Sequence, residues 1–398
     1  MSFVVIDPAY AQRAGHHHWL NAEWHGRLQG AGASLQVWAD RLAPSAPNIH
    51  PVFSGVGYAP AEHWSALPEA FHLAEILRLQ LEPAARDGPP VSGWLAHSLL
   101  PFQLLGLARF LGSQPPVFVL ISLMFDPAET LGSPALGPQA QRCCRMALLE
   151  LSLACRRAGH QLQLGVASLQ TLRRYRSLLQ EARLPEPRLH PAVVGAGCTL
   201  HPLPAAKPTT VLLHWGDLKP DKGRREALAV VRALLQGWQP SQTCRFVFHS
   251  FSHQELDPEE AAILLGAQQQ LGNGFEWLQG EVPTAVMQQR LAGCDVALLP
   301  YSPRSYAQRS SGVLWCYAAA RYAAGLPAAA IGYGGHWLQR EAEAFGMVWH
   351  VADAPWPVAL SQVLEQQGVA QATLWTSYAT EVLGRSFADW LVESLSLR

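Results

Sequence analysis

The sequence predicts an α/β protein with two doubly wound parallel-sheet domains, and three observations support this prediction. Short apolar segments of strand length alternate with longer amphipathic segments through both halves of the 398-residue chain, as in parallel sheets with crossover helices. Residues 195–210 interrupt the alternation with three prolines, two glycines and no periodicity. Hydrophobic residues make up 49% of the chain and charged residues 15%, which excludes disorder as its dominant state.

The interruption at residues 195–210 gives the expected domain boundary. We expect one domain at residues 1–200 and a second at residues 201–372. Residues 373–398 are expected to form a C-terminal helix that packs back across the domains. Right-handed crossovers would place the carboxyl ends of the strands of both sheets around a shared cleft.

The first half is expected to begin with a short strand, a loop at residues 14–18 that contains glycine, and a helix that Gly30 and Gly32 end. Ser168 is expected to cap a later helix. Apolar runs bounded by turn residues predict strands, and apolar residues at helical spacing predict helices. The expected strands are residues 3–7, 34–39, 52–54, 117–125, 161–167 and 188–194, and the expected helices are 19–29, 61–80, 92–112, 139–158 and 168–182.

The second half repeats the alternation. Thr284 is expected to cap one of its helices, and the last segment has an amphipathic pattern. Strands are predicted at residues 210–215, 245–250, 274–278, 295–300 and 328–331, and helices at 224–236, 257–271, 284–292, 310–324 and 370–396.

The charge and the cysteines narrow the class of protein. The net charge of −1 provides no global basic field for nucleic acid, so no nucleic-acid partner is expected. No apolar run reaches the length of a membrane span, and the N-terminus lacks the basic region of a signal peptide. Seven cysteines without CxxC spacing indicate buried thiols in a reducing compartment. These features favour a cytoplasmic protein, and peripheral membrane contact is left open.

The loop at residues 216–223, GDLKPDKG, is the strongest candidate for a phosphate-binding loop. All three lysines of the chain lie within 16 positions, and two of them, Lys219 and Lys222, are in this loop. Gly216 and Gly223 allow close backbone approach, and the following helix would direct its first N–H groups at an anion. The order of residues is not that of a Walker loop. The alternative is a solvated turn with surface lysines.

A second candidate loop, YSPRSYAQRSSG at residues 301–312, joins a predicted strand to a predicted helix. Arg309 stands at the start of that helix, and Ser310, Ser311 and Gly312 offer hydroxyl and backbone N–H donors. An arginine beside a helix N-terminus is a good receptor for a pyrophosphate. The alternative is a capping serine with an incidental arginine.

The third candidate is Gly15 with the histidine run at residues 16–18, and Asn21 close behind it. His16, His17 and His18 are adjacent, and neighbouring loop residues seldom all reach one metal ion, so metal binding is not expected. These imidazoles are instead expected to bind hydroxyl groups or to supply a base.

These stretches resemble a known family. HWGDLKPDKG, GEVPTAVMQQRLAGCDVALLPYSP and RSSGVLWCYAAARYAAGLP are similar to the C-terminal domain of GT-B glycosyltransferases of the glycogen-synthase-like retaining group, which is glycosyltransferase family 4-like. DPAYAQRAGHHHWLNAEWHGRLQGAGASLQVWA resembles the opening of the N-terminal domain in the same group. The resemblance implies GT-B architecture, with two Rossmann-like domains facing a cleft.

The resemblance also implies an activity and a set of binding residues. It implies a metal-independent, hexosyltransferase-type enzyme without a cofactor. Such an enzyme moves a sugar from a nucleotide-diphosphate donor to a glycan, lipid-linked or protein acceptor. The reaction would belong to bacterial-type glycan, glycolipid or glycoprotein assembly. The acceptor would meet Gly15, His16, His17, His18 and Asn21. The donor would meet Gly216, Asp217, Lys219, Lys222, Gly223, Glu281, Val282, Tyr301, Arg309, Ser310, Ser311, Gly312 and Val313.

The sequence departs from the family at two glutamates. These would fall near Arg309 and near residues 316–318, and neither position is acidic. The stereochemistry of transfer therefore stays open. The catalytic candidates are Lys222 and Arg309 for the leaving diphosphate, and His17 or Asp126 for a base, with His16 and His18 as further bases. Two alternative functions stay open, a catalytically impaired nucleotide-binding relative and a GT-B-shaped nucleotide-sugar epimerase.

Overall fold

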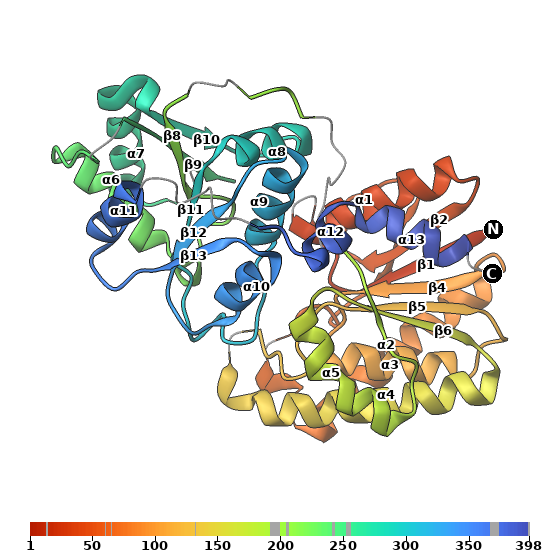
Figure 1. Ribbon diagram of the computed structural model, residues 1–398. Helices are drawn as coiled ribbons and strands as arrows, with labels where there is room; N and C mark the ends of the chain where they lie inside the picture. Colours follow the sequence, from red (N-terminus) through yellow and green to blue (C-terminus); the bar gives the residue numbers. More distant parts are fainter. Residues whose placement is uncertain are drawn as a thin grey trace. The chain divides into compact units, whose positions relative to one another are not determined.

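The computed structural model divides the chain into two compact units, each built around one parallel sheet (Figure 1). The first unit comprises Met1–Pro191 and Phe387–Arg398, and the second comprises Ala192–Ser386. No helix in the described part of the chain combines the length and the apolar character that crossing a bilayer requires. The described residues are 1–12, 15–59, 61–64, 66–131, 133–191, 200–203, 207–240, 243–251, 256–366 and 374–396.

The sheet of the first unit has seven parallel strands in the order β3-β2-β1-β4-β5-β6-β7. Its three central strands are buried along their whole length or nearly so, as expected where helices cover both faces of a parallel sheet. The strands are β1 (Ser2–Asp7), β2 (Ser34–Asp40), β3 (Ile49–Phe53), β4 (Gly93–His97), β5 (Phe118–Leu123), β6 (Gln161–Val166) and β7 (Arg188–Leu189).

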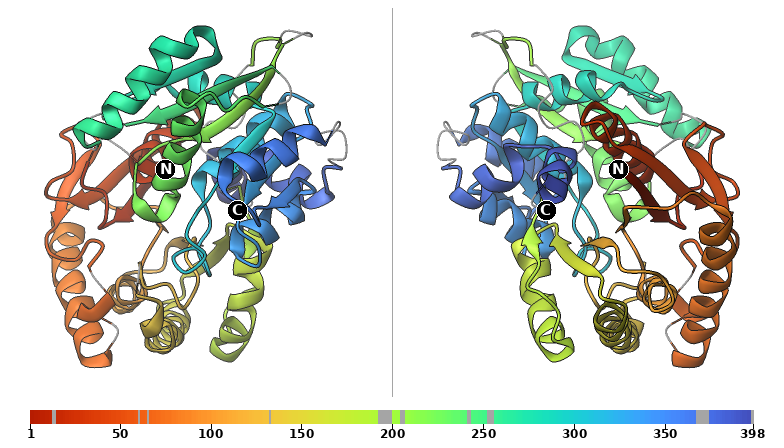
Figure 2. Two further views of the ribbon diagram at one scale, coloured as in Figure 1. Left: turned by 90° about the vertical axis from the view of Figure 1, so that its left-hand side faces the viewer. Right: turned by 90° about the vertical axis from the view of Figure 1, so that its right-hand side faces the viewer.

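Helices cover both faces of this sheet (Figure 1). On one face, α1 (Gly15–Gly30) packs against α13 (Phe387–Ser396), where the rings of Trp24 and Phe387 meet edge to face at 4.9 Å. The other face carries a continuous apolar core with four helices, and two further views show α4 and α5 next to each other (Figure 2). These helices are α2 (Leu67–Asp87), α3 (Pro101–Leu111), α4 (Gly137–Ala158) and α5 (Leu169–Ala182).

Two predictions for the first unit are wrong. Residues 92–112 are not one helix, because Gly93–His97 form β4 before α3 begins at Pro101. The segment is predominantly apolar on both sides of this boundary, so the periodicity gave no sign of the strand. His16, His17 and His18 do not lie in a loop either, because α1 begins at Gly15. Ala14 lies outside the described residues.

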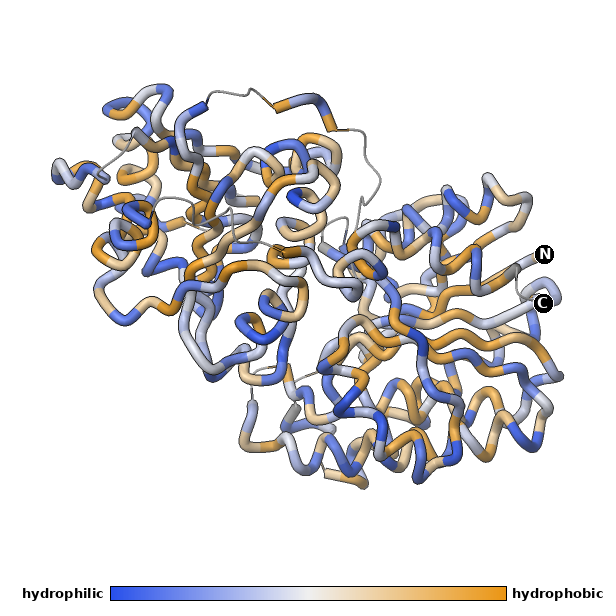
Figure 3. Tube along the Cα trace, viewed as in Figure 1, coloured by the Kyte–Doolittle hydropathy of each residue, from blue (hydrophilic) through white to orange (hydrophobic). Residues whose placement is uncertain are grey.

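The second unit contains six parallel strands in the order β10-β9-β8-β11-β12-β13. Figure 3 shows the strands of both sheets as predominantly hydrophobic segments. The strands are β8 (Thr209–His214), β9 (Cys244–Ser250), β10 (Phe275–Gln279), β11 (Val296–Leu299), β12 (Ala329–Gly332) and β13 (Val348–Val351). The helices are α6 (Arg224–Leu235), α7 (Pro258–Leu271), α8 (Thr284–Gly293), α9 (Gly312–Ala323), α10 (Trp337–Phe345), α11 (Trp356–Glu365) and α12 (Ser377–Leu383).

The helix ends in this unit differ in detail from the predictions. Pro283 is the N-cap of α8, so Thr284 is already the first helical residue. Helix α9 starts two residues later than expected, after its cap Ser311. The expected helix at 370–396 is two helices, because the chain leaves α12 at Gly384 and starts again at Phe387.

The domain boundaries also fall at other positions than expected. Half of the expected linker at residues 195–210 lies outside the described residues, and the first unit extends to Pro191. The final helix α13 belongs to this first unit, where the Gln163 amide donates to the Ser394 hydroxyl at 3.0 Å.

Candidate active site

Each sheet has one point where the strand order reverses. In the first unit β1 lies beside β4, and in the second β8 lies beside β11, with the chain continuing away from each pair in opposite directions. In open α/β sheets, ligands bind outside the carboxyl ends of the strands at such a point. Asp7 and His97 end β1 and β4, and His214 ends β8, so polar side chains stand at both points.

The loop after β8 gathers charge around one carboxylate. Asp217 Oδ2 lies 3.2 Å from Lys219 Nζ and 3.5 Å from Lys222 Nζ. Lys219 is exposed, whereas Lys222 is mostly buried. Burial lowers the pKa of Lys222, and the Asp217 carboxylate opposes this shift. The loop therefore presents one sheltered and one solvated ammonium group.

The loop after β11 lies directly against the first loop. The Ser302 amide donates to the carbonyl oxygen of Asp221 at 2.8 Å. The Arg309 guanidinium lies 3.6 Å from the Asp221 carboxylate and stacks over the Tyr306 ring at 5.5 Å. Because Asp221 immediately precedes Lys222, the structure brings Lys222 and Arg309 to the same edge of the second sheet.

Gly223 makes this contact between the loops feasible. It has a φ of +75°, and a Cβ atom there would stand 2.2 Å from Pro300 Cγ and 2.5 Å from the Pro300 carbonyl oxygen. Only glycine accommodates both the backbone conformation and the close approach. The start of α6 therefore packs against the carboxyl end of β11.

The two serines before α9 are already committed to structural contacts. Ser311 accepts a hydrogen bond from the Leu314 amide as the N-cap. Ser310 donates to the buried carboxylate of Glu341 at 2.5 Å and accepts from the Trp315 indole at 3.0 Å. Their side chains thus hold the loop in place. The groups of this segment that are suited to bind an anion are instead the first backbone N–H groups of α9.

The remaining predicted donor residues lie in the segments that follow β11 and β10. At Gly312 no atom lies within 4 Å of the position of a Cβ, and Val313 is half-buried. Tyr301 is buried, and burial raises the pKa of its phenol. Glu281 is exposed and Val282 half-buried in the loop after β10, which lies beyond β9 from β8 in the sheet.

His249, which is not among the residues predicted from the sequence, connects the loops after β8 and β10. Its Nδ1 lies 3.1 Å from the Gly216 amide nitrogen, and its Nε2 lies 2.9 Å from the Gly280 carbonyl oxygen. The ring also stacks on Trp215, with 4.4 Å between centroids. Its position inside an apolar strand gave no chemical signal, and only strand order places it beside Gly216.

His214 is a second missed residue of this edge. Its Nε2 lies 3.2 Å from the Asp217 carbonyl oxygen and therefore donates to it. Burial lowers the pKa of His214 to about 3, and the positive charge of Lys222 adds to that effect. The imidazole is therefore neutral and serves the loop as a hydrogen-bond donor.

The edge of the first unit carries a buried polar network that starts at Asp7. His17 Nδ1 lies 2.8 Å from Asp7 Oδ1, and the Asn21 amide donates to Asp7 Oδ2 at 2.7 Å. Since the amide nitrogen of Asn21 faces Asp7, its oxygen accepts from His97 Nε2 at 3.1 Å. On the outer side, His17 Nε2 lies 2.8 Å from the Tyr58 hydroxyl.

The ionisation of this network follows from its burial. Burial alone would raise the pKa of Asp7, but the charges of His17 and His97 and the hydrogen bonds from His17 and Asn21 lower it far below its ordinary value. Burial lowers the pKa of His97 to about 4. Burial and the Asp7 charge raise the pKa of Tyr58. The network therefore has an ionised Asp7 with a neutral His97 and a neutral phenol.

The three adjacent histidines diverge. His17 points into the network, whereas His16 is exposed and His18 Nδ1 lies 2.8 Å from the Tyr10 hydroxyl. Among the described residues, Asp7, His17 and His97 form the group whose ligand atoms, all within 4.8 Å, could surround a metal ion. Those atoms already hydrogen-bond to one another and to Asn21, which satisfies most of them without an ion.

Asp126 does not join this network. Its carboxylate lies 2.9 Å from Arg174 Nε and accepts from the Ala128 amide at 2.8 Å. These contacts anchor the loop after β5 to α5. Asp126 is therefore engaged as a structural carboxylate.

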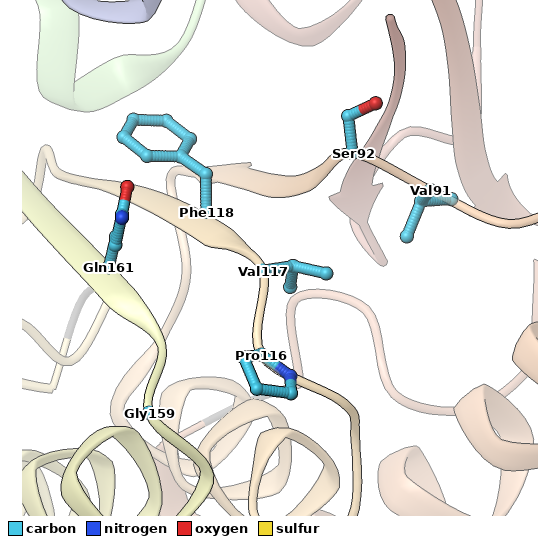
Figure 4. Close-up of a pocket in the computed structure, with 7 residues that line it drawn as sticks. All are labelled: Val91, Ser92, Pro116, Val117, Phe118, Gly159 and Gln161. Carbon is cyan, nitrogen blue, oxygen red and sulfur yellow. The ribbon is translucent and has the colours of Figure 1, made fainter. Parts of the chain in front are cut away.

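A pocket of about 310 Å³ lies at the opposite edge of the first sheet, at the amino ends of β4, β5 and β6 (Figure 4). Ser92 and Gln161 supply its polar side chains, and none of its lining residues is ionisable. This pocket therefore offers no acid–base chemistry.

Comparison with solved structures identifies the fold. No family model and no curated protein matches the sequence. The chain has the GT-B fold. Trehalose-6-phosphate synthase OtsA aligns over 100% of this chain and 99% of its own, with a TM-score of 0.58 and 13% identity. The α,α-trehalose 6-phosphate synthase of Burkholderia multivorans aligns over 100% and 96%, with a TM-score of 0.58 and 12% identity.

A third structure with the same fold was solved with a nucleotide sugar. The trehalose-6-phosphate protein of E. coli bound with UDP-2-fluoro glucose aligns over 100% of this chain and 99% of its own, with a TM-score of 0.57 and 13% identity. The GT-B architecture expected from the sequence is thus confirmed. The narrower resemblance to the glycogen-synthase-like group stays a prediction.

Proposed function

We propose that this chain is a glycosyltransferase that moves a sugar from a nucleotide-diphosphate donor to an acceptor hydroxyl. One observation carries the proposal. At the switch point of the second sheet, the loop with Lys222 contacts the loop with Arg309 through the 2.8 Å hydrogen bond from Ser302 to Asp221. Two basic side chains and the start of α9 therefore converge at one edge, as an anionic diphosphate requires.

The chemistry at this edge is charge stabilisation of the leaving diphosphate. Lys222 and Arg309 are now held by Asp217 and Asp221, at 3.5 and 3.6 Å. A donor diphosphate would exchange these weak, partly solvated ion pairs for phosphate contacts. One well-placed group in such a site contributes on the order of 10²–10³ in rate. With these cations in place, the proposed mechanism requires no metal.

On the first unit, we propose that His17 is the base for an acceptor hydroxyl. Asp7 orients the ring through Nδ1 and would stabilise the imidazolium formed on proton uptake. Nε2 contacts the Tyr58 hydroxyl, so the acceptor hydroxyl would replace that phenol or deliver its proton through it. Asp126 has no part in this proposal, because Arg174 holds its carboxylate.

The first experiment tests donor binding by thermal shift with a panel of nucleoside diphosphates and nucleotide sugars. A ligand at 100 times its Kd stabilises the chain by about 2.7 kcal/mol, which gives a readily measured shift. Turnover is then measured with the best donor and a mixture of acceptors. Binding without turnover would favour a non-catalytic relative, and an altered donor sugar without acceptor would favour an epimerase.

Variants then separate the two roles. Arg309→Ala should keep the fold and lose about 10²–10³ in kcat. His17→Gln and Asp7→Asn should lose turnover while donor affinity stays unchanged, since both lie on the other unit. Full activity of Arg309→Ala would refute the proposed diphosphate site, and full activity of His17→Gln would refute the proposed base.

A further inference from the structure

The charge of the chain is distributed unevenly. Residues 137–190 contain nine arginines and three glutamates, with no lysine or aspartate, which gives this segment a net charge of +6. The rest of the chain therefore carries −7, within a total of −1. This segment comprises α4, β6, α5 and β7 of the first unit. A concentration of one sign of charge on one part of a surface attracts partners of the opposite sign.

The outward side of α4 carries both positive and apolar groups. Arg142, Arg145, Leu149, Leu153 and Arg156 follow each other at intervals of three or four residues, so they lie on one helix face. All five are exposed, and the two leucines are 37% and 38% exposed. Arginines therefore flank two neighbouring leucines along the solvent-facing side of the helix.

Two pockets occupy the ends of this surface. One of about 400 Å³ lies between α4 and α5, with Arg142, Arg145 and the Glu181 carboxylate in its wall. The other, of about 330 Å³, lies at the carboxyl end of α4, with Arg156 and Arg183 in its wall. The second pocket presents two guanidinium groups to a volume that can take a small anionic group, and in the first, where Glu181 pairs with Arg145, Arg142 is the cation offered to such a group. We call the surface formed by these four arginines, Leu149 and Leu153 the α4–α5 face.

Most of this positive charge is not neutralised within the molecule. Arg145 pairs with Glu181, Arg174 with Asp126 and Arg176 with Glu186. Within the described residues, no ion pair involves the other basic residues of the segment that line the pockets or flank them. These are Arg142, Arg156, Arg157, Arg173 and Arg183.

We propose that the α4–α5 face binds the surface of a membrane that contains anionic lipids. The arginines in the two pockets bind phosphate head groups, and Leu149 and Leu153 enter the interfacial layer between them. A nucleic acid backbone would use the arginines but not the leucines. The described part of the segment also exposes no aromatic ring on which bases could stack, since Tyr175 is buried. The proposal does not depend on the proposed sugar transfer.

The test is co-sedimentation of the full chain, without donor, with vesicles of phosphatidylcholine alone or with phosphatidylglycerol added. We expect binding to the anionic vesicles, reduced by high salt, and none to the neutral ones. Arg142→Gln, Arg156→Gln and Arg183→Gln combined should weaken binding about 100-fold, since each cation near an anionic surface contributes roughly five-fold. Leu149→Ser with Leu153→Ser should weaken it about ten-fold.

A matched control removes the same charge elsewhere. Arg41→Gln, Arg225→Gln and Arg232→Gln combined should bind as the parent does, because these side chains lie outside the α4–α5 face. Equal losses in the control and the face variant would overturn the proposal, as would equal binding to neutral vesicles. Unchanged binding of the double leucine variant, or tighter binding to duplex DNA than to vesicles at the same salt, would identify a general polyanion surface and also overturn it.

Discussion

The imidazole of His249 accepts a hydrogen bond from the backbone amide of Gly216, with 3.1 Å between Nδ1 and the amide nitrogen. An amide can only donate, so Nδ1 is unprotonated and the proton is on Nε2, which donates to the Gly280 carbonyl. Burial lowers the pKa of His249, which favours this neutral form. One side chain thereby ties the lysine-containing loop after β8 to the loop that carries Glu281 and Val282.

His249→Phe tests this connection, because a phenyl ring can keep the stacking on Trp215 but makes neither hydrogen bond. We expect the free energy of unfolding to fall by about 1–3 kcal/mol, since two backbone groups lose their partner. We also expect roughly ten-fold weaker donor binding by calorimetry, with a smaller change in kcat, because the loop is less well positioned. An unchanged donor Kd would show that the connection has no part in binding.

Two glycines of the candidate donor site should differ in their tolerance of the same substitution. Gly223→Ala introduces a Cβ that collides with Pro300, at a residue whose own φ of +75° is unfavourable for alanine. We therefore expect a loss of about 2–4 kcal/mol in unfolding free energy. Gly312→Ala meets no atom within 4 Å and should leave stability within about 0.5 kcal/mol. Urea denaturation compares the two. Equal stabilities would contradict the close contact between the loops.

Glu341 should be important for the start of α9 although it is remote from it in sequence. Its buried carboxylate accepts from the Ser310 hydroxyl at 2.5 Å and from the Trp337 indole at 3.2 Å. Glu341→Leu leaves these donors without their acceptor, and we expect it to cost about 2–4 kcal/mol in urea denaturation. Glu343→Gln, at an exposed position of the same helix, is the control and should change stability by less than about 0.5 kcal/mol.

A double-mutant cycle isolates the contact between Ser310 and Glu341. Ser310→Ala with Glu341→Gln should show a coupling of about 0.5–3 kcal/mol, as for residues in one hydrogen-bond network. Additive effects of the two substitutions would mean that Glu341 acts on α9 through other contacts.

Much of the fold could be predicted because its signals are local. Strand and helix lengths, turn residues and the capping of α5 by Ser168 follow from neighbouring residues, and the structure confirms that cap with a 3.0 Å hydrogen bond from the Thr171 amide. Strand β4 was missed because Gly93–His97 and the following helix are both predominantly apolar, so no change of period marks the boundary.

The candidate site was harder to predict because its contacts are not local. Asp7 and His97 meet only because β1 and β4 are neighbours in the sheet, and their 90-residue separation gives no spacing to recognise. His249 and Glu341 were missed for the same reason, since each lies in an element whose packing decides its partner. The loops with Lys222 and Arg309 could be found because glycine, charge and a helix start stand together in the sequence.

Buried histidines should make the chain sensitive to mild acid. Burial lowers the pKa of His97 and His190 to about 4 and that of His214 to about 3, whereas an unfolded histidine titrates near 6.5. Between pH 6.5 and 4 the unfolded chain therefore binds protons that the folded chain does not, so stability is full above pH 6.5 and falls as the pH is lowered. Each histidine contributes a slope of about 1.4 kcal/mol per pH unit.

Urea denaturation at pH 7, 6 and 5 measures this slope, and His190→Asn tests one contribution to it. The His190 ring stacks on the Phe387 ring, with 4.2 Å between centroids. Its Nδ1 donates a hydrogen bond to the Pro191 carbonyl oxygen, so its Nε2 accepts a hydrogen bond from the Ser122 hydroxyl. The variant should be less stable at pH 7 but should lose less stability towards pH 5, because one buried titrating group is gone. His201→Asn, at an exposed position, should keep the parent slope. Stability that is independent of pH over this range would contradict the burial of neutral histidines at these positions.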